Sequence, residues 1–123
     1  MRILVTGGSG FIGSHLTDLF LERGDHVTIV DDLSTGRSAN LAHLAENPNL
    51  KVIHRDLSDP ALVAEVCSQA DAVYHLAAAV GVALIAAHPI ETIHRNIYPT
   101  QLILEALRKE QSAGQRTAVP GKH

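Results

Sequence analysis

Four closely spaced glycines and a later aspartate are the residues whose types and spacing most directly indicate chemistry. Gly8, Gly10 and Gly13 fit the spacing G-x-G-x-x-G, and Gly7 shares the wider spacing G-x-x-G-x-x-G with the last two. A backbone without Cβ atoms can approach a pyrophosphate closely, and the helix N-terminus that follows offers N–H groups and a positive dipole end. Asp31 follows about 20 residues later, where a carboxylate can accept hydrogen bonds from ribose hydroxyls. The pattern indicates dinucleotide binding.

Two strands and a helix are needed to position these residues, and the flanking sequence predicts all three. Residues 2–5 form a short apolar run typical of a buried parallel strand, and residues 27–30 form a second one. Between them, a helix starting near Phe11 is expected to stop at Gly24, with apolar positions at 12, 16, 19 and 20. Strand, glycine turn, helix, strand and acid in this order indicate a dinucleotide-binding unit. The alternative is an ordinary tight turn that binds nothing.

The aspartate also predicts which dinucleotide binds. A 2′-phosphate beside Asp31 would place like charges ~5 Å apart, which costs several kcal/mol at an effective dielectric constant of ~20. The sequence therefore favours NAD over NADP. Arg37 is close in the chain and is a candidate phosphate partner, which moderates the preference.

Composition limits the classes of protein to which the chain can belong. Its 123 residues, 46% hydrophobic and 19% charged, are typical of one small ordered domain. A formal net charge of −3 gives no general basic field, so nucleic acids and anionic membranes are poor partner candidates. Cys67 is the single cysteine and is expected to be buried, so no disulfide framework can form. The sequence shows neither a signal-peptide pattern nor an apolar run of about 18 residues, so a cytoplasmic protein is expected.

The rest of the chain continues as alternating strands and helices. Strands are expected at residues 51–54 and 72–76, and helices at 40–44, 61–69 and 90–111. Parallel strands joined by right-handed crossovers predict an α/β fold, a doubly wound parallel sheet with the simplest strand order 3-2-1-4. Residues 1–110 would then form one incomplete domain of this kind, and residues 111–123 a polar, flexible tail.

Local signals indicate how two of these helices begin and bend. Ser58 or Asp59 is a good N-cap for the helix at 61–69, with Pro60 at its first position. Within residues 90–111, Pro99 is expected to kink or split the helix because proline has no N–H. The apolar residues of this helix that are available for burial are at positions 93, 97, 102, 103, 104 and 107.

Five motifs in this order resemble those of the extended short-chain dehydrogenase/reductase family. They are residues 6–16, 31–36, 55–57 and 75–78, and Asn96. Among its members, the chain is most similar to NAD-dependent nucleotide-sugar epimerases and dehydratases of the UDP-glucose 4-epimerase kind. The resemblance covers about residues 1–110, is highly specific for the family and is weakly specific for the sugar. It implies a Rossmann-type sheet.

The resemblance implies a set of NAD-binding residues, grouped by the part of the cofactor that they would contact. The pyrophosphate would be held by Gly7, Gly10, Phe11, Ile12 and Gly13. The adenosine ribose would be held by Asp31, Asp32, Ser34 and Thr35. The adenine would lie against the Leu57 backbone and donate to Asp56, and the nicotinamide-side ribose would pass Leu76, Ala77, Ala78 and Ala79. Asn96 matches the asparagine of the family pattern Asn-x-x-Gly-Thr, in which this chain has Pro99 at the glycine position.

Some of these residues also have simpler interpretations. Asp56 could open the following helix, the alanines at 77–79 could serve close packing alone, and Asn96 could be a solvated or self-satisfied polar group. The eight histidines show no metal-ligand spacing with cysteine, so each is expected to be structural or at the surface and no metal site is expected.

Catalysis in the family uses a tyrosine and a lysine four residues later, with a serine or threonine upstream. Here the fourth residue after Tyr74 is Ala78, and the fourth after Tyr98 is Leu102. The family's catalytic segment would follow a fifth strand, but residues 111–123 show no strand pattern. We therefore expect a truncated chain that is inactive alone and acts on a nucleotide sugar only in a full-length form.

Two other functions and one physical consequence remain open at this point. The chain could be a dinucleotide-binding module without chemistry, or an enzyme that receives its tyrosine and lysine from a partner chain. Without a fifth strand, the fourth would expose apolar residues and unpaired backbone groups. We therefore expect marginal stability or self-association through the exposed sheet edge.

Overall fold

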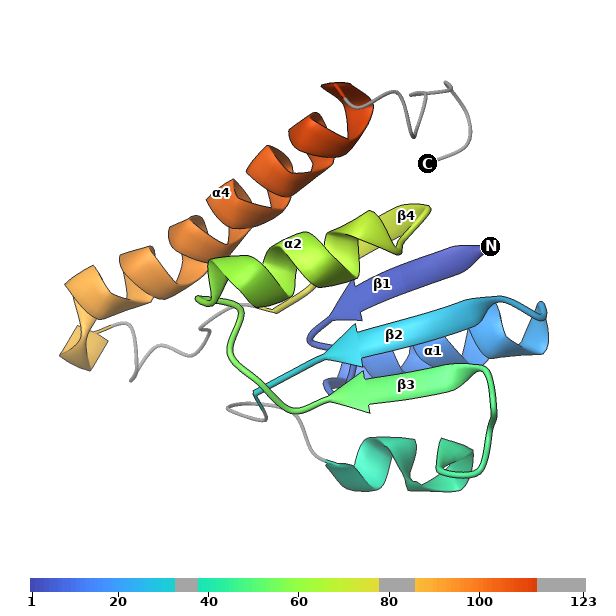
Figure 1. Ribbon diagram of the computed structural model, residues 1–123. Helices are drawn as coiled ribbons and strands as arrows, with labels where there is room; N and C mark the ends of the chain where they lie inside the picture. The colour runs from blue at the N-terminus through green and yellow to red at the C-terminus, as the bar shows by residue number, and fades with distance from the viewer. Residues whose placement is uncertain (33–37, 78–85, 113–123) are drawn as a thin grey trace.

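The computed structural model describes residues 1–32, 38–77 and 86–112. Within them, four parallel strands form one sheet in the order β3-β2-β1-β4, with helices on both faces (Figure 1). The strands are β1 (Arg2–Thr6), β2 (His26–Val30), β3 (Leu50–Ile53) and β4 (Ala72–His75). The helices are α1 (Phe11–Glu22), the 3₁₀ helix η1 (Ser38–Leu44), α2 (Pro60–Ser68) and α4 (Pro89–Ser112). The predicted doubly wound sheet and its strand order are confirmed.

Each face of the sheet has its own apolar core, because successive side chains of a strand point to opposite faces. On the face covered by α1 and η1, the buried residues are Ile3, Val5, Phe20, Leu21, Val27, Ile29 and Leu41. On the face covered by α2 and α4, they are Leu4, Val30, Leu57, Leu62, Val63, Val66, Cys67, Ala70 and Ile103. Both faces are covered, which explains why the strand sequences are apolar runs without polar alternation.

The buried side of α1 includes only some of its apolar residues. Ile12 and Leu19 are 64% and 52% exposed, whereas Thr17 is fully buried. The buried residues of this helix are Gly13, Ser14, Thr17, Phe20 and Leu21. The helix starts directly against the glycine turn, where small residues fit, and the Thr17 hydroxyl is satisfied by donating to the Gly13 carbonyl at 2.8 Å. Of the four apolar positions at helical spacing, 12 and 19 therefore lie outside the core.

The start of α2 agrees with its sequence signals. Asp59 is the N-cap, and its carboxylate accepts a hydrogen bond from the Ala61 N–H at 3.0 Å. Pro60 occupies the first helical position, where its missing N–H costs nothing. This cap brings the apolar side of α2 onto the sheet.

Pro99 does not split α4. The helix runs from Pro89 to Ser112 with the proline inside it, and Figure 1 shows one continuous ribbon. Proline removes the hydrogen bond that would reach the Arg95 carbonyl. The turns on either side are held by packing, since Thr92 and Ile103 are buried. Tertiary contacts therefore outweigh one lost hydrogen bond. Of the two predicted outcomes, a kink or a split, the split does not occur.

Three of the apolar residues of α4 that were expected to be available for burial lie at the surface. Ile93, Ile97 and Leu104 are 57%, 58% and 62% exposed. Ile103 is buried, and Leu102 and Leu107 pack partly against the core shared with α2. Among the described elements, α2 is the helix that packs along α4, so only one side of α4 is covered. An apolar side chain can be buried, but the number of neighbouring elements decides how many of the apolar side chains of a helix are buried.

Candidate functional site

The glycine turn between β1 and α1 is a closely packed backbone structure. Gly7 has φ +71°, a left-handed conformation that favours glycine, and its N–H donates to the Val30 carbonyl at 2.9 Å. A Cβ atom on Gly7 would lie 2.8 Å from the Ala77 nitrogen, and one on Gly13 would lie 2.4 Å from the Gly7 carbonyl oxygen. A Cβ on Gly10 would meet that oxygen at a milder 3.3 Å. Gly7 and Gly13 therefore allow three backbone segments to meet at this turn.

The turn leaves the first amides of α1 without a cap among the described side chains. The first i to i−4 bond runs from the Ser14 N–H to the Gly10 carbonyl at 2.9 Å, so the amides of residues 11–13 precede it. The N-cap is Gly10, which has no side chain to accept from them. Phe11 and Ile12 are exposed. These amides, at the positive end of a 12-residue helix, are chemically suited to an anion.

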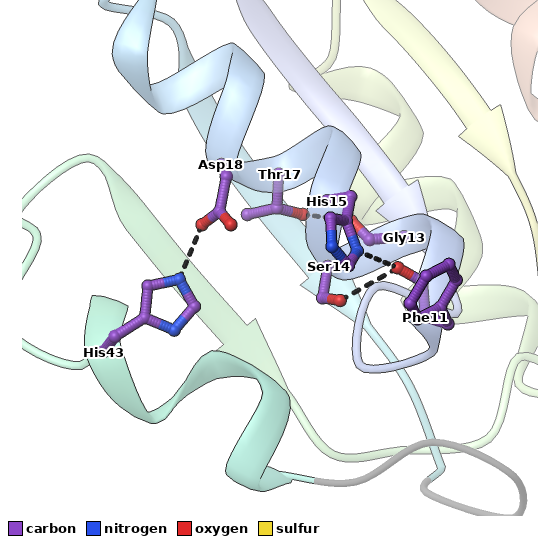
Figure 2. A network of polar contacts seen from close by, with 7 residues as sticks. All are labelled: Phe11, Gly13, Ser14, His15, Thr17, Asp18 and His43. Atoms are coloured by element: carbon purple, nitrogen blue, oxygen red, sulfur yellow. Dashed lines mark hydrogen bonds and ion pairs between the residues drawn. The ribbon is translucent and has the colours of Figure 1, made fainter.

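The polar side chains at the start of α1 bond to carbonyls rather than to these amides (Figure 2). The Ser14 hydroxyl donates to the Phe11 carbonyl at 3.0 Å, and His15 Nδ1 lies 2.7 Å from the same oxygen. The Phe11 and His15 rings lie with centroids 4.5 Å apart. Farther along the helix, His43 Nε2 lies 2.8 Å from the Asp18 carboxylate and ties η1 to α1. None of these contacts uses the N–H groups of residues 11–13.

Two residues distant in sequence hold the Ser9 peptide groups of the turn. The carboxylate of Asp31 accepts from the Ser9 N–H at 2.9 Å, and the Asn40 side-chain amide donates to the Ser9 carbonyl at 2.7 Å. Asp31 is only 7% exposed, so the carboxylate is directed at the turn from the end of β2. Asn40 was missed by the sequence analysis, because nothing in a lone asparagine of η1 indicates a contact 31 residues away.

Other proposed cofactor residues also lie beyond the C-terminal ends of the strands. Asp32 pairs with Arg95 of α4 at 3.3 Å. Asp56 accepts from the Ser58 N–H at 3.0 Å, the geometry of a local turn, and Leu57 is buried beneath α2. The carboxylate of Asp56 is exposed, so this turn and a contact with adenine are compatible.

The end of β4 is joined to β1 and α4 by a chain of hydrogen bonds. Thr6 Oγ1 lies 2.6 Å from His75 Nδ1 and accepts from the Ala77 N–H at 3.1 Å. On the other side of the ring, His75 Nε2 lies 3.1 Å from Thr100 Oγ1. The Thr100 hydroxyl donates to the Asn96 carbonyl at 3.0 Å. All five residues fall within or beside the family motifs named above, Thr6 at the start of residues 6–16 and Thr100 at the threonine of Asn-x-x-Gly-Thr. The motifs did not indicate that these side chains bond to one another.

Burial lowers the pKa of His75 below its ordinary value of 6.5. The unfolded chain then takes up a proton in a pH range in which the folded chain does not, so acidification favours unfolding. We expect the free energy of unfolding, measured by urea titration, to include the whole contribution of His75 above pH 6.5. It should decrease as the pH falls below 6.5. A His75→Asn variant should lose less stability between pH 7.5 and 5.5 than the wild type. An equal loss in both would contradict this origin of the pH dependence.

The remaining predicted site residues lie outside the described residues: Ser34 and Thr35 after β2, and Ala78 and Ala79 after β4. Among the described ones, Gly7, Gly10, Gly13 and Asp31 lie around one turn. In the described ranges, no three acidic, histidine or cysteine side chains come close enough to hold a metal ion, and no helix is long and apolar enough to cross a membrane.

Comparison with known proteins places this arrangement in a family. The sequence profile of the GDP-mannose 4,6-dehydratase family matches residues 4–119. The chain belongs to this family. The resemblance to epimerases and dehydratases of the extended short-chain dehydrogenase/reductase group, inferred from the motifs, is thereby confirmed.

Individual relatives differ in the reactions for which they are named. UDP-glucuronic acid decarboxylase 1 of Arabidopsis thaliana is 41% identical over 100 residues, 81% of this chain and 22% of that protein. UDP-glucose 4-epimerase of Thermotoga maritima, solved with UDP-glucose, is 37% identical with a TM-score of 0.77, over 89% of this chain and 34% of that one. dTDP-glucose 4,6-dehydratase of Streptomyces venezuelae, solved with NAD bound, is 36% identical with a TM-score of 0.81, over 93% and 37%. The chain thus spans about a fifth to just over a third of their lengths.

Proposed function

We propose that this chain is the NAD-binding part of a nucleotide-sugar epimerase, dehydratase or decarboxylase. The observation that carries the proposal is the pairing of the uncapped α1 amides with a carboxylate directed at the same turn. Asp31 reaches the Ser9 N–H at 2.9 Å, so its position relative to those amides is set before any ligand binds. A turn that served only to join a strand to a helix would not need that carboxylate.

The residues present fit NAD. The amides of residues 11–13 would hold the pyrophosphate, where Gly10 adds no side-chain bulk. The Asp31 carboxylate has about four acceptor sites on two oxygens, so it can keep its bond to Ser9 and accept from ribose hydroxyls. The backbone at Leu76 and Ala77 would pass the nicotinamide-side ribose. Bound NAD would supply reversible hydride transfer at a sugar carbon.

The proposal includes no proton transfer by this chain. The side chain of Tyr74 packs into the sheet core, with its ring centroid 5.0 Å from that of Phe20, and Tyr98 stacks on His94 at 5.2 Å. Neither tyrosine has a lysine four residues later. We propose that this chain binds the cofactor without turnover, and that turnover requires a tyrosine and a lysine that it does not carry.

Calorimetric titration of the chain with NAD and with NADP tests the proposal. We expect NAD to bind, and NADP to bind at least about tenfold more weakly because its 2′-phosphate meets the Asp31 carboxylate. Circular dichroism on the same sample shows whether the chain is folded. A folded chain that binds neither dinucleotide would overturn the proposed function. Self-association through the edge of β4 stays a prediction, and sedimentation velocity at several concentrations would test it.

A further inference from the structure

We propose that His75 is a positioning residue for the dinucleotide site: its neutral ring, with the proton on Nε2, holds the Leu76–Ala77 peptide against the glycine turn. The inference rests on the proposed function and deepens it. It assigns a role to a side chain that is not itself expected to contact the cofactor. The argument starts from the four hydrogen-bond contacts around the ring.

The direction of these contacts follows from what each group can donate. The Ala77 N–H can only donate, and it does so to Thr6 Oγ1 at 3.1 Å. At the other end, the Asn96 carbonyl can only accept, and it takes the Thr100 hydroxyl hydrogen at 3.0 Å. Thr100 Oγ1 has then used its hydrogen, so it must accept from His75 Nε2–H at 3.1 Å. His75 Nδ1 is then unprotonated and accepts from the Thr6 hydroxyl at 2.6 Å.

The other neutral tautomer satisfies fewer groups. With the proton on Nδ1, Thr6 Oγ1 would accept from both His75 and Ala77. The Thr6 hydroxyl hydrogen would then have no acceptor among the groups of this series. Thr100 would have to turn its hydrogen to Nε2 and give up the bond to Asn96. The Nε2–H tautomer uses four donors and four acceptors once each, and Thr6 is fully buried, so a hydroxyl without an acceptor would be costly there. The contacts therefore select a single state of the ring.

This chain of bonds ends at the peptide that lies against Gly7. A Cβ atom on Gly7 would be 2.8 Å from the Ala77 nitrogen and 2.9 Å from the Leu76 carbonyl carbon, so the two segments are in close contact. Because the Leu76–Ala77 peptide is planar and trans, holding its N–H on Thr6 also sets the direction of the Leu76 carbonyl. Thr6 immediately precedes Gly7, and Thr100 belongs to the α4 turn that contains Asn96. His75 thus joins three segments that carry proposed NAD-binding residues.

The tautomer can be read directly from the protein by nuclear magnetic resonance. A long-range ¹H–¹⁵N spectrum of the folded chain at pH 7.5 should show His75 with an unprotonated Nδ1 and a protonated Nε2. A histidine without fixed partners exchanges between both tautomers, with Nε2–H the more populated, so it would show averaged nitrogen signals rather than those of Nε2–H alone. A protonated Nδ1, or a mixture of the two tautomers, would overturn the proposal whether or not the chain binds NAD.

Three variants on α4 test the positioning role. Thr100→Val removes the acceptor of the His75 proton, Thr100→Ser keeps it, and Thr92→Val is the matched control. Thr92 is on the same helix, is buried and makes the same kind of bond, to the His88 carbonyl at 2.7 Å. It takes no part in the series of hydrogen bonds through His75. We expect Thr100→Val to speed hydrogen exchange of the Ala77 amide and to weaken NAD binding, each by about tenfold. Thr100→Ser and Thr92→Val should stay within about twofold of the wild type.

The outcomes separate this inference from the proposed function. If the wild type binds no NAD, the proposed function fails, while the Ala77 exchange rate and the ring tautomer still decide whether His75 holds the peptide. If the wild type binds NAD but Thr100→Val leaves exchange and affinity unchanged, His75 is not a positioning residue. Equal losses in Thr100→Val and Thr92→Val would show a general weakening of α4 and would also overturn the inference.

Discussion

Gly13→Ala is expected to destabilise the fold strongly. Its Cβ atom would lie 2.4 Å from the Gly7 carbonyl oxygen and 2.8 Å from the Gly8 Cα atom. Both obstacles are backbone, and the Gly7 carbonyl also accepts from the Gly10 N–H at 3.1 Å, so the turn cannot yield without losing that bond. Overpacking of this kind costs about 1–3 kcal/mol even where side chains can adjust. We expect a loss of about 3 kcal/mol or more in the free energy of unfolding, measured by urea titration.

The matched control is the same substitution three residues earlier. Gly10 is in an extended conformation with φ −74°, and a Cβ there meets the Gly7 carbonyl oxygen at 3.3 Å. Gly10→Ala should therefore lower stability by less than about 1 kcal/mol while weakening NAD binding, because its methyl group would stand where we propose that the pyrophosphate binds. If Gly13→Ala unfolds at the same urea concentration as Gly10→Ala, the close approach of α1 to the turn is not needed for stability.

Asp31→Asn is expected to reverse much of the preference for NAD. The asparagine oxygen can still accept from the Ser9 N–H, so the turn should keep its shape. The variant would lose the charge-assisted bond that we propose between Asp31 and the ribose, which we expect to weaken NAD binding by about tenfold. It also loses the repulsion of a 2′-phosphate, which we expect to strengthen NADP binding by about tenfold. Calorimetric titration should show the ratio of the two dissociation constants changing by about a hundredfold.

Asp71 provides the control for this substitution. Its carboxylate also accepts from a backbone N–H, that of Arg2 at 2.8 Å. This contact lies at the opposite ends of the strands, where β1 begins. Asp71→Asn should leave the NAD to NADP ratio within about twofold of the wild type. A ratio in Asp31→Asn that stays near the wild-type value would show that the carboxylate at the end of β2 does not select the cofactor.

The fold was predictable from sequence because its signals are local and mutually consistent. Apolar runs that lack polar alternation predicted strands buried on both faces, and right-handed crossovers between them left 3-2-1-4 as the simplest order. The observed sheet has that order. Asp59 and Pro60 marked the start of α2 within a residue, since capping depends on the few amides at a helix end. The glycine spacing likewise indicated a turn at which a bare backbone is required.

Predictions that depended on neighbouring elements succeeded less well. In α1 the apolar residues Ile12 and Leu19 recur at helical spacing but are exposed, and close packing at the turn buries Gly13 and Thr17 instead. In α4, Pro99 taken by itself predicted a kink or a split, and packing on both sides of it keeps the helix unsplit. In both helices, the packing of neighbouring elements decided which residues are buried and whether the helix continues.

Local sequence was sufficient for the order of the elements, the glycine turn and the acid that follows β2, because each depends on spacing within a few residues or on the short path of one crossover. Three-dimensional packing was required for the rest of the site. Thr6 and His75 are 69 residues apart and His75 and Thr100 are 25 apart. They meet only because β4 pairs with β1 in register and α4 covers the face to which both side chains point, which no spacing along the chain specifies.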